Sequence, residues 1–200
     1  VDGELVTVRQ SLIGQRVRLD RPGQYEADAE HLLAYFERNK DHLERWSPTR
    51  KHNYYSKDYW ATAVAEAAEK EGDDKALEFI VREQSSSGGT VIGMFSFSEI
   101  TRDAFQACYL GYSIDQAHEG KGLMQEALAL AIDYAFNEMT LHRIMANYQP
   151  SNTRSAKTLE ALDFNVEGLA KKYLFIDGDW RDHVLTSLVN PNSEAPNSLT

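Results

Sequence analysis

The chain has 200 residues, a formal net charge of −10, and 42% hydrophobic and 26% charged residues. These values predict one globular domain over residues 1–190, and the acidity argues against direct nucleic-acid binding. No apolar run is long enough for a membrane span, the single cysteine excludes an intrachain disulfide, and the histidines show no metal-ligand spacing. We therefore expect a cytoplasmic protein without a metal, and a disordered polar tail over residues 191–200.

The apolar pattern predicts helices early in the chain and strands mainly after residue 75. This order indicates a mixed α/β domain of about seven strands and four helices, with crossover helices only in the second half. Asp177-Gly178 is typical of a hairpin turn between the last two strands. The expected elements are a strand at 16–19, helices at 25–43 and 56–72, strands at 76–83, 90–100 and 106–114, a helix at 123–138, a strand at 143–149, a helix at 152–164, and strands at 171–177 and 181–189.

Two glycines, Gly120 and Gly122, stand between a predicted strand and a predicted helix. Glycine allows a tight turn and a close ligand approach, and the free N–H groups of a helix start bind anions, most often phosphate. The spacing fails the nucleotide triphosphate motif because Leu123 stands where Ser or Thr is needed, and it fails the dinucleotide motif because Gln125 replaces a glycine. A plain flexible turn remains the alternative at this point.

The stretch "HEGKGLMQEAL" resembles motif A of the GCN5-related N-acetyltransferase superfamily, whose pattern is Q/R-x-x-G-x-G/A. "NYQPSNTRSAKTLEALDFNVEG" is similar to the segment after the fifth strand of these enzymes. Together with "ACYLGYSI" and "YLFIDGDWRDHVLT", these blocks resemble the bacterial ribosomal-protein-alanine N-acetyltransferases. Aligned by Gly122 and the helix start, the match departs from the motif at Glu119 and Met124. Aligned by both glycines, it departs at Ala117. The resemblance implies a mostly antiparallel, twisted central sheet.

The resemblance implies acetyl-CoA as cosubstrate, with its pyrophosphate on the amides of the glycine turn and its pantetheine arm beside Asn152 and Ser155. Both residues also have plain interpretations, Asn152 as a helix cap with Ser151 as its competitor, and Ser155 as an ordinary first-turn residue. Lys121 is interpreted either as a phosphate contact or as a solvated side chain. The implied cofactor-binding residues are Ser113, Ile114, Glu119, Gly120, Lys121, Gly122, Leu123, Met124, Asn152 and Ser155.

Direct attack of an amine on the thioester is the implied chemistry, with positioning and oxyanion stabilisation as the main sources of rate. Backbone N–H groups around Tyr112 are implied to face the reacting carbonyl, and Ser155 to lie near the sulfur. Relatives often place a glutamate base where this chain has Tyr109, and a tyrosine acid where it has Leu159. Glu99 is a candidate base acting through water, or else a solvated carboxylate at a strand end.

The implied acceptor is the N-terminal alanine of a ribosomal protein, with small-subunit protein five as the expected one, either free or on the ribosome. The first two helices and the final hairpin are implied to form its groove. Alternatives are a small amine, such as a polyamine or aminoglycoside, and a CoA-binding ribosome assembly factor. The groove candidates are aromatic residues that are equally typical of packing, Trp46, Tyr54, Tyr55, Trp60 and Trp180, and acidic residues that are equally typical of turns, Glu44, Asp177, Asp179 and Asp182.

Overall fold

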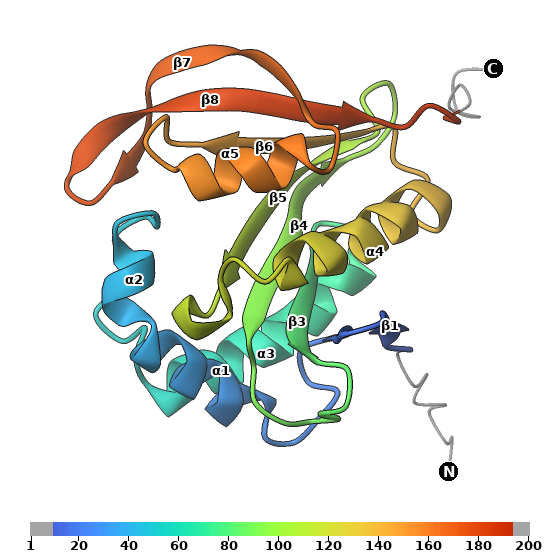
Figure 1. Ribbon diagram of the computed structural model, residues 1–200. Coiled ribbons are helices and arrows are strands. Elements are labelled where there is room, and N and C mark those ends of the chain that lie inside the picture. The colour runs from blue at the N-terminus through green and yellow to red at the C-terminus, as the bar shows by residue number, and fades with distance from the viewer. Residues whose placement is uncertain (1–9, 194–200) are drawn as a thin grey trace.

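The computed structural model describes residues 10–193 (Figure 1). Its elements confirm the predicted mixed α/β fold and add a short strand, β1, and a short helix, α2. Residues 194–200 of the expected tail lie outside the described residues. In chain order the elements are β1 (Leu12–Ile13), β2 (Val17–Asp20), α1 (Asp28–Arg38), α2 (Lys40–Glu44), α3 (Lys57–Gly72), β3 (Leu77–Glu83), β4 (Gly93–Thr101), β5 (Ala107–Ile114), the 3-10 helix η1 (Gln116–His118), α4 (Leu123–Asn137), β6 (Arg143–Tyr148), α5 (Thr153–Glu160), β7 (Asn165–Ile176) and β8 (Asp179–Val189).

The strands form one eight-stranded sheet in the order β1-β2-β3-β4-β5-β6-β8-β7. Neighbouring strands are antiparallel everywhere except at β5 and β6, which run parallel and are joined through α4. A parallel pair needs a long crossover, and α4 supplies it. Among residues 10–193, no helix has the length and apolar character needed to cross a lipid bilayer.

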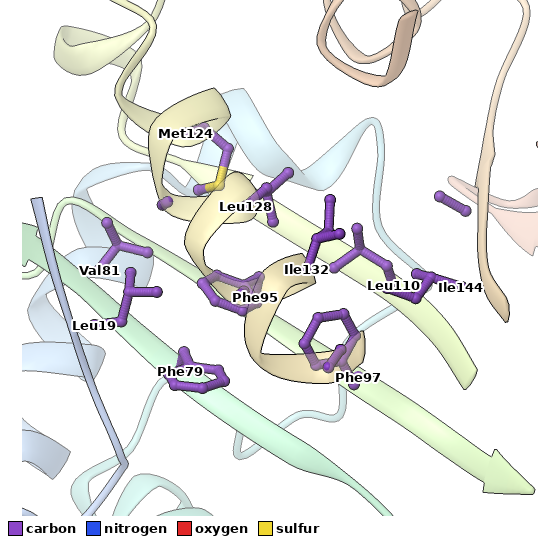
Figure 2. Packing of buried hydrophobic residues seen from close by; sticks show 14 of the residues in the cluster. Leu19, Phe79, Val81, Phe95, Phe97, Leu110, Met124, Leu128, Ile132 and Ile144 are labelled. Atoms are coloured by element: carbon purple, nitrogen blue, oxygen red, sulfur yellow. The ribbon is translucent and has the colours of Figure 1, made fainter. Parts of the chain in front are cut away.

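Around β3, both faces of the sheet are covered by helices. On β3, Phe79 and Val81 point into the cluster that includes α4, whereas Ile80 points into the cluster formed with α1 and α3. Figure 2 shows the first cluster, in which aromatic rings of the sheet pack beneath the apolar side chains of α4. Successive side chains of a strand point to opposite faces, so a strand covered on both sides has a nearly continuous apolar sequence. Each such side chain contributes about 1.5–3 kcal/mol when fully buried.

The helix predicted over residues 25–43 is divided at Asn39, which takes a non-helical conformation between α1 and α2. Its side-chain amide donates to Tyr35 O at 2.9 Å and to the Asp115 carboxylate at 3.1 Å, and its Oδ1 accepts the Gln116 N–H at 3.0 Å. The prediction of one unbroken helix was therefore wrong. A buried asparagine that bonds to the segment after β5 interrupts the helix and anchors α1 beside that segment.

The parallel strands β5 and β6 are paired over only three residues each. Ala107 to Tyr109 pair with Arg143 to Met145, after which β5 continues to Ile114 without β6 as a partner. The two halves of the sheet open apart beyond this point, with α5 beside β6 (Figure 1). The opening leaves one backbone edge of β5 free in the middle of the sheet, and the candidate site is built around it.

Candidate functional site

The free edge of β5 presents two backbone N–H groups to the opening. Asp115 donates its N–H to Ile92 O at 2.8 Å, on the β4 side of the strand. Since N–H groups alternate in direction along a strand, Ser113 shares this direction, whereas the N–H groups of Ile114 and Tyr112 point toward the opening. Of the amides expected to face a reacting carbonyl, these two have the required direction.

The turn before α4 requires its glycines. Gly120 has φ +71° and Gly122 has φ +72°, both in the left-handed region that side chains with a Cβ rarely adopt. Gly122 is the N-cap of α4, and no side chain caps this helix. The first-turn N–H groups of α4 are therefore left to a ligand or to solvent, and the positive end of the helix dipole adds to their attraction for an anion.

Arg16 holds this turn from the other end of the chain. Its guanidinium donates to Lys121 O at 2.9 Å and to the Glu126 carboxylate in α4 at 2.7 Å, and its backbone N–H donates to the same carboxylate at 2.7 Å. Bonds to Arg16 outweigh the effect of burial and lower the pKa of Glu126. Sequence analysis missed this role, because no local signal connects a residue before β2 with a turn more than a hundred positions later.

The start of α5 joins the opening through two side chains. Asn152 caps the helix by accepting the Ser155 N–H at 3.1 Å, and the Ser155 hydroxyl lies 2.7 Å from the Tyr112 hydroxyl of β5. Burial raises the pKa of Tyr112 to about 12, although its bond to Ser155 acts in the opposite direction. The phenol therefore stays protonated at neutral pH and can donate to Ser155. Sequence analysis placed Tyr112 here for its backbone and missed its hydroxyl.

Two adjoining cavities bring most of the predicted cofactor residues together. One of about 360 Å³ extends from α2 past β5 to the start of α5, and one of about 250 Å³ lies at the glycine turn. Lys121 lines neither cavity and is exposed. The predicted residues that line the first cavity are Tyr112, Ser113, Ile114, Glu119, Met124, Asn152 and Ser155, and those that line the second are Ile114, Glu119, Gly120, Gly122, Leu123 and Met124.

Glu119 carries the negative charge of this groove and is mostly covered. Its carboxylate lies 2.7 Å from Arg154 of α5 and 3.3 Å from the imidazole of His42 in α2. Sequence analysis did not assign a role to either partner, although Arg154 stands in the same "NTRS" segment as Asn152 and Ser155. The ion pair joins the glycine turn to α5 across the opening.

Comparison with known proteins identifies the family. A family model described as "Acetyltransferase (GNAT) domain" matches residues 16–165. The chain belongs to this family. It is 42% identical to the [Ribosomal protein uS5]-alanine N-acetyltransferase of Escherichia coli K12 over 168 aligned residues. The aligned region covers 84% of this chain and 86% of that protein.

Two solved structures of acetyltransferases are similar to this chain in fold and in sequence. The ribosomal-protein-S5-alanine acetyltransferase of Vibrio fischeri has a TM-score of 0.86 at 38% identity, over 93% of this chain and all of that one. RimJ of Mycobacterium smegmatis, solved in complex with CoA-disulfide, has a TM-score of 0.80 at 28% identity, over 88% and 85% of the two chains. The predicted GNAT fold and membership in the acetyltransferase family are confirmed.

The aromatic residues expected at the acceptor groove of this acetyltransferase have different environments. Trp60 stacks on Phe36 with ring centroids 4.6 Å apart, inside the cluster beneath α1 and α3. Trp46 lines the cavity of about 360 Å³ that also contains Ser155, whereas Trp180 is 54% exposed on the final hairpin. Packing is thus the role of Trp60, and Trp46 is the predicted groove tryptophan that reaches the candidate site.

The candidate base is not gathered with the other site residues. Glu99 is exposed, has φ +51°, and lies at a register shift between β4 and β5. It lines neither cavity of the groove, so the structure does not bring it together with Ser155. Its charge acts instead on Tyr109, whose pKa is raised first by a hydrogen bond with Tyr173, then by burial and by Glu99.

The end of the final hairpin lies against the linker between α2 and α3, where Pro48 pairs with Ile176. A cavity of about 490 Å³ beside this contact is lined by Glu44 and Asp177, two of the acidic groove candidates. The same cavity is also lined by Lys40, Arg50 and Lys51. Its charge is therefore mixed, and it does not form the acidic surface that was expected to attract a basic ribosomal-protein tail.

Proposed function

We propose that the chain is an acetyl-CoA-dependent N-α-acetyltransferase that modifies the N-terminal alanine of ribosomal protein uS5. The observation that carries this proposal is the opened β5 edge between an uncapped, glycine-led helix and the Tyr112–Ser155 pair. The relatives named for uS5-alanine acetylation support the choice of acceptor. A ribosomal acceptor also favours a cytoplasmic location and transient contact with the ribosome. All eight strands, from β1 to β8 along the chain, belong to one sheet, and this supports one domain over residues 1–190.

The groove suits acetyl-CoA in two respects. The N–H groups at the start of α4, which no side chain caps, and the two glycines with positive φ provide a main-chain site for a pyrophosphate. The free β5 edge provides N–H groups for the amide-containing pantetheine arm and for the thioester carbonyl. When bound, acetyl-CoA supplies an activated acetyl group that an amine can attack directly.

The chain's own groups then have distinct roles. The N–H groups of Tyr112 and Ile114 stabilise the charge that develops on the carbonyl oxygen, a contribution that depends on their being fixed before the reaction. The amine releases its proton to water, and the Ser155 hydroxyl donates a proton to the leaving sulfur. The Tyr112 phenol, hydrogen-bonded to Ser155, returns a proton to the serine oxygen and is itself reprotonated from water. Asn152 fixes the first turn of α5 and thereby the position of Ser155.

Tyr109 stands where relatives often place a glutamate base, and this favours an α-amine as acceptor. An α-amino group has a pKa of about 8, so about a tenth of it is neutral at pH 7, whereas lysine, with a pKa of about 10.4, is neutral in roughly one part in 2,500. An α-amine can therefore attack without an efficient proton acceptor in the enzyme. This argument favours an N-terminus over a lysine side chain at the same site.

The test is acetyl transfer from acetyl-CoA to uS5, followed by mass spectrometry of intact and digested protein. We expect one acetyl group on the N-terminal alanine, and faster reaction with a peptide that starts with alanine than with an N-terminally blocked peptide that carries lysine. Faster lysine acetylation would contradict the proposal. Transfer only to spermidine or an aminoglycoside would indicate the small-amine alternative, and ribosome binding without transfer would indicate the assembly factor.

Ser155→Ala tests the assigned chemistry. We expect kcat to fall about a hundredfold, since a positioned proton donor typically contributes about 10²–10⁴. The Kd for acetyl-CoA should stay within about twofold, because the amides at the start of α4 are unchanged. An unchanged kcat would remove Ser155 from the reaction.

A further inference from the structure

A carboxylate stands inside the groove at the place where the proposed function needs an anion to bind. Glu119 directly precedes Gly120, lines both cavities, and has a side chain that is only 15% exposed. A negative charge in this position opposes the binding of a pyrophosphate, because like charges a few ångströms apart repel strongly where water is partly excluded. The family motif has glutamine or arginine near this position, so the glutamate needs its own explanation.

Arg154 gives that explanation. It is bound to Glu119 with an N–O distance of 2.7 Å, and it lines the same two cavities. Its side chain is 72% exposed, so the guanidinium can turn toward a ligand, whereas Glu119 is held between Arg154 and His42. A guanidinium binds phosphate as well as carboxylate, and it does so with two parallel hydrogen bonds when the geometry allows.

We infer that Glu119 is an internal substitute for the pyrophosphate. In the empty protein it holds Arg154 at the entrance of the glycine-turn cavity. When the cofactor binds, Arg154 exchanges the carboxylate for the pyrophosphate, and Glu119 keeps His42 as its partner. This inference rests on the proposed function, because it takes the glycine turn to be the pyrophosphate site.

The exchange makes Glu119 a residue that limits affinity. When the cofactor binds, the ion pair between Arg154 and Glu119 must break, and the pyrophosphate comes close to the Glu119 carboxylate. Arg154 therefore adds less to the binding free energy than its charge alone would give. The same balance eases the release of the product CoA, a step that limits turnover in many enzymes. The dependence on pyrophosphate distinguishes this role from a general effect of surface charge.

The test compares three ligands with the full chain by isothermal titration calorimetry. CoA carries the pyrophosphate and the 3′-phosphate, dephospho-CoA keeps only the pyrophosphate, and pantetheine has neither. We expect Glu119→Gln to lower the Kd of CoA and of dephospho-CoA about two- to tenfold, and Arg154→Gln to raise both by a similar factor. The Kd of pantetheine should change by less than about twofold in both variants.

Glu83→Gln is the matched control. Glu83 is also a carboxylate near the glycine turn, with the His118 imidazole 3.8 Å away, but it lines neither cavity. Its removal should leave all three affinities within about twofold of the parent protein. Glutamine keeps the shape and hydrogen-bonding capacity of Glu119, and the exposed Arg154 offers a second variant that does not depend on the folding of the first.

The outcomes separate the exchange from the proposed function. If the parent protein binds CoA and Glu119→Gln weakens that binding or leaves it unchanged, the exchange is wrong while the cofactor site stands. An equal effect of the variants on pantetheine would also overturn it, because the pyrophosphate would then not be the group involved. If the variants changed the Kd of CoA but not the Kd of dephospho-CoA, Arg154 would contact the 3′-phosphate, and this result would contradict the exchange. If the parent protein binds neither CoA nor dephospho-CoA, the proposed function fails as well.

Discussion

Gly122→Ala isolates the backbone conformation on which the proposed cofactor site depends. A Cβ at this position would meet no atom closer than the Arg16 guanidinium at 3.5 Å, which is an ordinary contact. The cost therefore comes from φ +72° rather than from crowding, and a left-handed residue with a Cβ costs about 1–2 kcal/mol. For a chain of this length, about 2–4 °C of Tm corresponds to each kcal/mol, so the Tm should fall by about 2–8 °C.

The same substitution should weaken cofactor binding more than it weakens the fold. If residue 122 relaxes toward a right-handed conformation, the first N–H groups of α4 change direction, and each lost hydrogen bond to a charged ligand is worth about 1.5–3 kcal/mol. The loss of one such bond raises the Kd for CoA by about tenfold or more. Gly122→Val should have a larger effect on both quantities, because a β-branched residue tolerates positive φ least.

Gly72→Ala is the matched control for the Gly122 experiment. Gly72 ends α3, has no positive φ, and a Cβ there would meet no atom within 4 Å. Alanine at this place should raise the stability by up to about 1 kcal/mol through helix propensity and leave CoA binding unchanged. Thermal unfolding with and without CoA, together with calorimetric titration, measures both quantities. A Gly122→Ala protein with the parent Tm and the parent Kd would refute the assignment of the turn.

Three further substitutions, the last with a neighbouring control, test the elements around the turn. Burial acts to raise the pKa of Asp115, but hydrogen bonds from Asn39 and Arg38 outweigh it and lower the pKa from 3.8 to about 2. The carboxylate therefore stabilises the fold above pH 4, and this stabilisation is lost as the pH falls toward 2. Asp115→Asn should therefore cost about 2 kcal/mol in urea unfolding at pH 7 and flatten the loss of stability between pH 4 and pH 2, and equal acid sensitivity in both proteins would contradict this. Tyr112→Phe should lower kcat about tenfold with little change in the Kd for acetyl-CoA, and a kcat equal to that of the parent would exclude the phenol from proton transfer. Asn152→Ala should cost about 1 kcal/mol of unfolding free energy by removing the cap of α5, whereas Ser151→Ala, its neighbour in the sequence, should cost less than about half of that.

Elements whose determinants are local could be predicted well. The helix predicted at 56–72 is α3, and Ser56 at its start caps it by accepting the Tyr59 N–H. Asp177 and Gly178 both take positive φ in the turn between β7 and β8, which is the conformation that this residue pair favours in a two-residue hairpin. In both cases the partner atoms lie within a few residues, so the sequence contains all the information that decides the structure.

Features that depend on distant partners could not be predicted. Asn39 divides a helix because its amide bonds to Asp115, 76 positions away, and nothing in the helix itself indicates the break. Glu99 was a candidate base at a strand end, but it takes φ +51° at a register shift between β4 and β5 and lines neither cavity of the groove. A bulge of this kind depends on the pairing of two strands, and that pairing is set only when the sheet forms.

Glu119 shows why a departure from a motif can carry more information than the match. By sequence alone it marked a lost contact, because in the alignment by Gly122 a carboxylate stands where the family often has glutamine or arginine. In the folded chain that carboxylate lies between Arg154 and the His42 imidazole, so the positive charge beside the turn comes from Arg154 of α5. If the glycine turn binds the pyrophosphate, as proposed, Arg154 is a cation that α5 places beside it. A sequence motif does not record such a neighbour, because it describes adjacent positions of the turn and not the residues that other elements bring to it.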